Sequence, residues 1–290
     1  MEERTIVSFG YAIKYLLREK ANFGITSGFL RELLKRKVEV TAILESESNK
    51  DVPDKKTNRV DMKAQIDGAE IAVFEIQFLE TVDFFGKVLF GVSKAVVEQV
   101  SEGARYDIKK IYSVNIAYYN IGARREYLFN GKFDGFKGVH FKDETIPFTQ
   151  AGDLAAKSSP KRDIHPEYYL ILPEMFDGQM RDRFDEWVYV LKKSAVRNDF
   201  TAEGIKEALQ KLDKLQMSPE QRNAYNRYLE DRYSVESAIR TGIMTGREEG
   251  EAKGREEMAA EIAKELKFDG MPVEKIAQIT GLATEYIKKI

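Results

Sequence analysis

The pattern of apolar and polar positions predicts helices at both ends of the chain, with strands between them. Residues 8–37 repeat apolar side chains at helical spacing, with a break near Gly24–Gly28, and residues 82–103 form a second amphipathic helix. Segments that are β-branched or alternate in polarity lie between and after these helices, at 38–44, 59–66, 71–78 and 111–119. The order α-β-β-β-α-β predicts an α/β protein with a mixed sheet flanked by helices.

The second half of the chain is expected to be mostly helical. After shorter strands and loops, helical patterns follow Pro173, and in the run GIMTGREEGEAKGREE glycine recurs every four residues. On a helix these glycines would lie along one stripe, and the alternative is a flexible charged linker. We expect four regions: a mixed-sheet core over 1–175, a helical extension over 176–240, a glycine-punctuated charged helix or linker over 241–270, and a tail over 271–290.

Composition narrows the class of protein. The chain has 290 residues, 43% of them hydrophobic, with a net charge of −2 and no cysteine. These values are typical of a soluble protein with a real core, and they exclude disulfides, thiol catalysis and cysteine-bound zinc. The apolar runs are too short to cross a bilayer and the N-terminus carries acids where a signal peptide is basic, so we expect a cytoplasmic protein that does not span a membrane.

Carboxylates interrupt two neighbouring strand segments. Asp61 lies in the first, while Glu75 and Gln77 share one face of the second, which is otherwise apolar. A three-residue loop, Asp67-Gly68-Ala69, would set Asp61 directly opposite Glu75. A two-residue loop would instead put them on opposite faces, because a slip of one residue reverses every side chain.

Two opposed carboxylates repel each other, and a divalent cation between them would remove that penalty. Oxygen ligands without a nearby histidine or cysteine favour Mg²⁺ or Mn²⁺ over zinc. The alternative is a buried structural pair satisfied by Arg59, by Lys63 or by backbone donors.

Four stretches resemble one known family. They are FGYAIKYLL, NRVDMKAQIDGAEIAVFEIQF, KAVVEQVSEGARYDIKKIYSVNIAYYNI and TGLATEYIKKI. Asp61 with Glu75-Ile76-Gln77 looks like the D…ExQ variant of the D…(D/E)xK motif. The chain resembles the PD-(D/E)XK transposase-like proteins, the recombination-promoting nucleases, over most of residues 8–120 and at the C-terminal end.

The resemblance implies a restriction-endonuclease-like core and Mg²⁺-dependent (or Mn²⁺-dependent) cleavage of DNA. It implies that Asp61 and Glu75 bind the metal and that Gln77 stands in place of the usual lysine. Gln99 matches a glutamine common on the helix after the hairpin, so it is expected to line the site.

Two departures from the family pattern affect the expected site. Where many relatives have an acidic residue in the first helix, this chain has Gly10, so Glu45 or Glu47 is a candidate accessory ligand. Gln77 cannot supply the positive charge of a lysine, and Lys63 or Arg59 is a candidate source of it.

The tail over 271–290 has helix-turn-helix spacing. A helix-turn-helix needs a small residue where its helices cross, a glycine in the turn and a branched apolar residue that anchors the second helix. The tail has Ala277, Gly281 and Ile287 at these positions. Its basic side chains are candidate phosphate contacts: Lys275, Lys288 and Lys289. A helical hairpin that docks or oligomerises is the alternative.

Two functional hypotheses follow. The first is a Mg²⁺-dependent DNA endonuclease of a transposase-like or recombination-promoting family, with DNA as substrate and a possible homo-oligomer formed through the helical C-terminal region. The second is a catalytically inactive protein with a nuclease fold that serves as a DNA-binding or assembly module. Loss of metal-dependent cleavage in Asp61→Ala would distinguish them.

Overall fold

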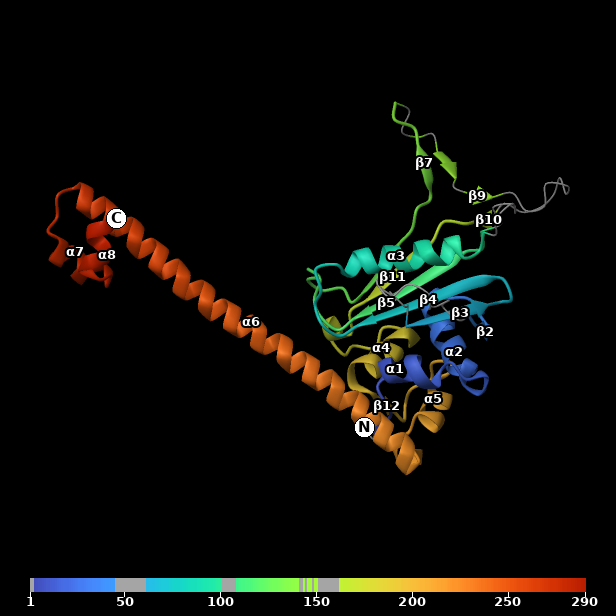
Figure 1. Cartoon of the computed structure of the whole chain (residues 1–290). Coiled ribbons are helices and arrows are strands. Elements are labelled where there is room, and N and C mark those ends of the chain that lie inside the picture. The colour runs from blue at the N-terminus through green and yellow to red at the C-terminus, as the bar shows by residue number, and fades with distance from the viewer. Residues whose placement is uncertain are drawn as a thin grey trace. The chain divides into compact units, whose positions relative to one another are not determined.

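A six-stranded mixed sheet forms the centre of the larger of two compact units, Met1–Tyr225 and Asn226–Ile290 (Figure 1). The computed structural model describes residues 3–44, 61–100, 108–140, 143, 145–147, 149–150 and 162–290. The strands follow the spatial order β2 (Val40–Ile43), β3 (Met62–Ile66), β4 (Glu70–Gln77), β5 (Ile111–Ala117), β11 (Glu167–Ile171) and β6 (Leu128–Gly131).

The strand directions confirm the expected mixed sheet. β4 and β11 both run parallel to β5, while β3 is antiparallel to β4 and β6 is antiparallel to β11. The other strands form three antiparallel pairs: β1 (Glu3–Thr5) with β12 (Ala195–Arg197), β7 (Gly135–Lys137) with β8 (Thr145–Pro147), and β9 (Thr149–Gln150) with β10 (Arg162–Asp163).

Helices cover both faces of the sheet. α3 (Phe84–Val97) lies on one face, and the N-terminal helices with α4 and α5 lie on the other (Figure 1). Their bounds are α1 (Phe9–Tyr11), η1 (Ala12–Leu16), η2 (Lys20–Asn22), α2 (Phe23–Leu34), η3 (Pro173–Met175), α4 (Arg183–Lys193), α5 (Ile205–Lys211) and η4 (Lys214–Gln216).

Side-chain alternation along β4 explains this layering. Phe74 points to the face covered by α2 and packs in an aromatic core around Phe29, whose ring lies 5.5 Å from Trp187 and 6.1 Å from Phe74. Ile71 and Val73 point to the other face and pack with residues of α3. Residues 71–74 are buried because helices cover both faces of the sheet, whereas the polar residues of β4, Glu70, Glu75 and Gln77, are partly buried.

The structure corrects two expected helix boundaries. Gly24–Gly28 does not break the first helical region, since both glycines lie inside α2, and the interruption falls at residues 17–22 instead. The second helix was expected over 82–103, but α3 ends at Val97 and residues 98 and 99 form a turn. Gly28 is needed for packing: a Cβ there would lie 2.3 Å from the carbonyl oxygen of Glu203.

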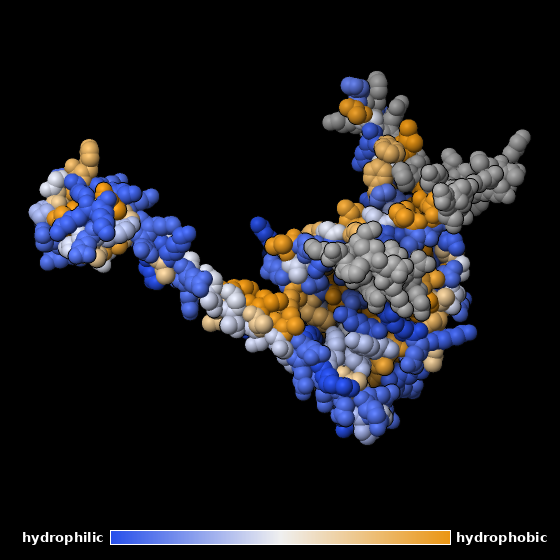
Figure 2. Space-filling model, viewed as in Figure 1, coloured by the Kyte–Doolittle hydropathy of each residue, from blue (hydrophilic) through white to orange (hydrophobic). Residues whose placement is uncertain are grey.

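The second unit is helical. α6 (Pro219–Phe268) continues into it through all four regularly spaced glycines, and α7 (Val273–Thr280) and α8 (Thr284–Lys289) follow. Ile276 and Ile287 are buried against Ala263 of α6, and Gly281 makes the turn between α7 and α8 with a φ of 74°. The part of this unit that carries α7 and α8 is largely hydrophilic on the face seen in Figure 2. Among the described residues, no helix combines the length and the apolar character that a membrane span requires.

Candidate active site

The β3–β4 hairpin has the three-residue loop that brings the two carboxylates together. Ile66 pairs with Glu70 and Met62 with Phe74, and Asp67 and Gly68 adopt positive φ angles of 51° and 70°. One further step of this register sets Asp61, the residue before β3, opposite Glu75. The predicted three-residue loop and its register are therefore confirmed, and the charge of Asp61 acts on Glu75.

Asp61 is fixed from both sides. It lies just before the residue where β3 begins, and its Oδ2 accepts a hydrogen bond of 2.7 Å from the backbone N–H of Ile76. Its Oδ1 lies 3.2 Å from Nζ of Lys14, and the guanidinium of Arg18 donates to its backbone carbonyl. The carboxylate thus takes the place of the next backbone pairing partner of β4 and remains ionically paired.

Glu75 is a carboxylate held between layers. Burial raises its pKa most, the charge of Asp61 raises it further, and the ammonium groups of Lys87 and Lys14 partly offset these effects, leaving the pKa at about 7. Partial burial and the neighbouring carboxylate both disfavour the ionised form of Glu75. A cation bound here would favour that form.

Gln77 follows Glu75 on the same face at the end of β4. Its amide Nε2 donates a hydrogen bond of 3.1 Å to the carbonyl oxygen of Leu79. The side chain carries no charge, so the third motif position contributes orientation and hydrogen bonding but not a positive charge.

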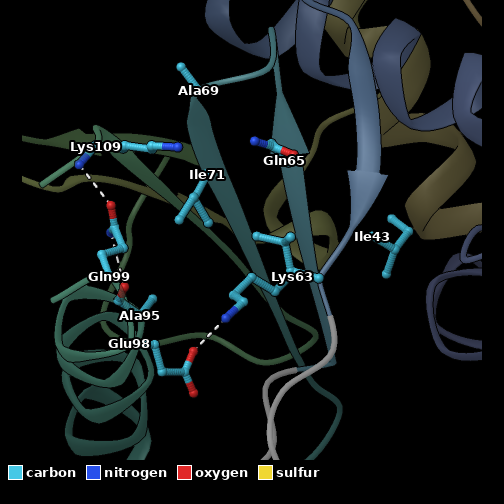
Figure 3. Close-up of a pocket in the computed structure, with 10 residues that line it drawn as sticks. Ile43, Lys63, Gln65, Ala69, Ile71, Ala95, Glu98, Gln99 and Lys109 are labelled. Carbon is cyan, nitrogen blue, oxygen red and sulfur yellow. Dashed lines mark hydrogen bonds and ion pairs between the residues drawn. The ribbon is translucent and has the colours of Figure 1, made fainter. Parts of the chain in front are cut away.

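Lys63 and Gln99 line a separate part of the same sheet face. Lys63 points to Glu98 at the end of α3 and forms an ion pair with it (Figure 3). Gln99 donates to the carbonyl of Ala95 at 3.0 Å and accepts from the N–H of Lys109 at 2.7 Å. These residues line a cavity of about 510 Å³ whose lining includes neither of the opposed carboxylates.

Other expected site residues stand apart from this arrangement. Glu45, Glu47 and Arg59 lie outside the described residues. Lys275, Lys288 and Lys289 are exposed on the second unit. Gly10 is buried in α1. Because it has no side chain, it cannot supply the acidic group that many relatives have at this position.

Sequence reasoning missed the two cations that contact Asp61. Lys14 lies in the π turn η1 and Arg18 lies in the turn that follows it, and both contact Asp61. Lys14 is the polar interruption in the apolar run FGYAIKYLL. That interruption was the available signal, but only the tertiary structure brings it to residue 61.

The oxygen donors present fit a Mg²⁺ ion. Within the described part of the chain, no group of three or more histidine, cysteine, aspartate or glutamate side chains is placed to hold a metal. Mg²⁺, however, keeps several waters and is commonly bound by one or two carboxylates together with a substrate phosphate. Asp61 and Glu75 supply that number of carboxylates, and a closed cage of protein ligands is not required.

Comparison with known protein families gives one match. Residues 8–132 match the family model of the PD-(D/E)XK nuclease family transposases. This segment belongs to that family. No curated protein and no solved structure gives a significant match.

The segment of the PD-(D/E)XK transposase family contains Lys14, both carboxylates, Gln77 and Gln99. It also runs through β2 to β5 and ends just after β6, so β11, α4 and the second unit lie beyond it. The mixed six-stranded sheet with flanking helices and a helical C-terminal region is consistent with the PD-(D/E)XK nuclease fold, and family membership indicates a nuclease as the general class.

Proposed function

We propose that the protein is a Mg²⁺-dependent DNA endonuclease that hydrolyses phosphodiester bonds, and that Asp61 and Glu75 hold the metal. The opposition of these two carboxylates across the β3–β4 hairpin is the observation that carries the proposal. A carboxylate pair between layers is costly to keep in a stable protein unless it binds something positive. Family membership points to DNA as the substrate.

Asp61, Glu75 and Gln77 would have different roles in the hydrolysis. Asp61, whose Oδ2 is anchored by the N–H of Ile76, would offer its Oδ1 to the metal in exchange for Lys14, and Glu75 would supply the second carboxylate. The bound Mg²⁺ would supply a polarised water and neutralise charge on the phosphate. Gln77 exchanges its hydrogen bond to Leu79 for one to the attacking water or a phosphate oxygen.

Contacts of the second unit with DNA extend the proposal. Lys275, Lys288 and Lys289 are exposed on or beside the α7–α8 hairpin, where they would meet phosphates without reading sequence. A homo-oligomer formed through the helical region would supply a second catalytic site for cutting both strands.

Cleavage of supercoiled plasmid with Mg²⁺ or Mn²⁺ tests the proposal. We expect nicked or linear product from the wild type, and none from Asp61→Ala, from Glu75→Gln or with EDTA. The matched control is Glu70→Gln, which removes a carboxylate from the same strand at the end remote from Asp61, where Glu70 pairs with Arg36. This control should cleave like the wild type.

The opposite result has a defined meaning. If the wild type binds plasmid but shows no metal-dependent cleavage, the protein is a catalytically inactive module on a nuclease fold. Cleavage that survives both substitutions would place the active site elsewhere.

A further inference from the structure

Among the described residues, Lys14 forms an ion pair with the carboxylate of Asp61. Its Nζ lies 3.2 Å from Oδ1 of Asp61, and its charge also acts on Glu75. Asp61 is mostly buried while Lys14 remains partly open to solvent. A positive group that solvent can reach is therefore in direct contact with one of the two carboxylates.

The local backbone that delivers Lys14 is unusual. η1 is a π-helical turn, in which the N–H of Leu17 donates to the carbonyl of Ala12 over 2.8 Å. Single π turns are rare, and they are found frequently at functional sites. Ile13 and Leu17 on either side of Lys14 are fully buried, so the turn holds the base of the lysine in place while its ammonium reaches Asp61.

The neighbouring cations have other partners. Lys63 pairs with Glu98, and Lys87 lies 3.6 Å from Asp83 in the first turn of α3. The guanidinium of Arg18 holds the backbone carbonyl of Asp61, not its carboxylate. Within the described residues, Lys14 is the cation that forms an ion pair with a member of the carboxylate pair.

We propose that Lys14 is the catalytic cation of this site and replaces the lysine that Gln77 lacks, by donating to an oxygen of the scissile phosphate. The inference rests on the proposed nuclease function. In the structure the ammonium of Lys14 pairs with Asp61; in the complex with DNA it would exchange the Asp61 oxygen for a phosphate oxygen. Lysine is a compact, mobile donor, which suits such an exchange.

The assisted step is an ordinary hydrolysis. The oxygen of water forms a bond to phosphorus, the bond from phosphorus to the leaving sugar oxygen breaks with its electron pair, and a proton from the water ends on that oxygen. Lys14 keeps its proton throughout. It stabilises the negative charge that grows on the phosphate oxygens, where fixed positive groups have their largest effect.

This role predicts two effects of opposite sign. Because Lys14 competes with a metal ion for Asp61, its removal should tighten metal binding in the absence of DNA. Because it also stabilises the transition state, the same removal should slow cleavage at saturating metal. A lysine that only supported the fold would weaken both.

The experiment compares Lys14→Met with Lys20→Met in the full chain. Lys20 is an exposed lysine of the same N-terminal segment with no contact to Asp61, so it controls for the loss of one charge. Calorimetric titration with Mn²⁺ alone measures metal affinity, single-turnover plasmid cleavage at saturating Mg²⁺ measures the rate, and thermal unfolding monitors the fold. Lys14→Arg keeps the charge and serves if the methionine variant does not fold.

We expect Lys14→Met to cleave about 100-fold more slowly, the range for loss of one stabilising donor. It should bind Mn²⁺ about twofold to fivefold more tightly, as expected from removal of a partly exposed ion pair. Lys14→Arg should recover part of the rate, and Lys20→Met should match the wild type in both measurements.

Three outcomes would overturn the inference. They are wild-type cleavage by Lys14→Met at saturating Mg²⁺, weaker Mn²⁺ binding together with slower cleavage, and failure of a folded Lys14→Arg to cleave faster than Lys14→Met. The first two leave the nuclease proposal standing, whereas a wild type that does not cleave removes both.

Discussion

At the scale of single residues, the site is governed by the cost of its carboxylates. Glu75 interrupts an apolar strand and faces Asp61, and burial is the largest cause of its raised pKa. The protonated form of Glu75 is therefore favoured in the folded protein. Since the ordinary pKa of this group is 4.5 and the folded value is about 7, its contribution to stability falls as pH rises through this interval.

Because the contribution of Glu75 to stability falls as pH rises, Glu75→Gln should stabilise the protein at high pH. Without metal at pH 8, the variant should unfold at a higher temperature than the wild type, because an ionised buried carboxylate has been replaced by a neutral amide. The difference should shrink at pH 5, where Glu75 is mostly protonated in the folded state. Thermal unfolding in EDTA at the two pH values measures it.

Mg²⁺ supplies the control for this prediction. At pH 8, added Mg²⁺ should raise the unfolding temperature of the wild type by mass action and leave Glu75→Gln nearly unchanged. A variant less stable than the wild type at pH 8 in EDTA would show that Glu75 is satisfied by the protein itself.

At the scale of elements, one loop fixes the register of the β3–β4 hairpin and one helix packs against the sheet behind it. The Asp67-Gly68-Ala69 loop fixes the register of β3 and β4, and the packing of α2 supports the opposite face of the sheet. α2 approaches the turn before α5 so closely that there is no space for a side chain at residue 28, where the nearest atoms belong to the backbone of Glu203 and Gly204. This contact explains a glycine that the sequence alone suggested was a helix break.

Alanine substitutions at two helical glycines should therefore have opposite effects. Gly28→Ala should lower the free energy of unfolding by about 1–3 kcal/mol, because backbone must move to admit the methyl group. Gly86→Ala in α3 should be neutral or raise it by about 0.5–1 kcal/mol, since nothing lies within 4 Å of the added Cβ and alanine favours the helix. Urea unfolding of both variants measures these changes, and equal effects would contradict the packing argument.

At the scale of the whole molecule, the α7–α8 hairpin of the second unit differs from α6 in how its basic side chains are arranged. Around the α7–α8 hairpin the candidate DNA contacts are exposed lysines. Along α6, basic side chains pair with glutamates one turn away, as Arg247 does with Glu251 at 2.7 Å and Lys253 with Glu257 at 3.8 Å. A polyanion should therefore be attracted to the hairpin more than to the long helix.

The salt dependence of DNA binding tests this distribution. Replacing Lys275, Lys288 and Lys289 together by glutamine should reduce the slope of log affinity against log salt by roughly 2 to 3, since each phosphate contact contributes about 0.9. The matched control replaces Arg247, Lys253 and Arg255, which removes the same charge from α6 and should change the slope much less. Equal changes in both triple variants would show that the hairpin makes no particular phosphate contact.

The sequence by itself determined what depends on local rules. Alternation along a strand placed Glu75 and Gln77 on one face, and the loop length left two registers, of which the structure contains the one that opposes Asp61 to Glu75. The order of elements gave the mixed sheet, because short apolar segments between amphipathic helices have few other ways to bury both faces. These features follow from the pattern of residues along the chain and need no knowledge of which distant segments touch.

Only the tertiary structure decided the partners of those residues. Lys14 and Asp61 are 47 positions apart, and nothing in local periodicity indicates that a π turn brings the first to the second. In the same way, the packing of α3 on the sheet brings Glu98 to Lys63, and Lys63 forms its ion pair with Glu98. Contacts between distant segments depend on how layers pack, and the charge balance of the site is made of such contacts.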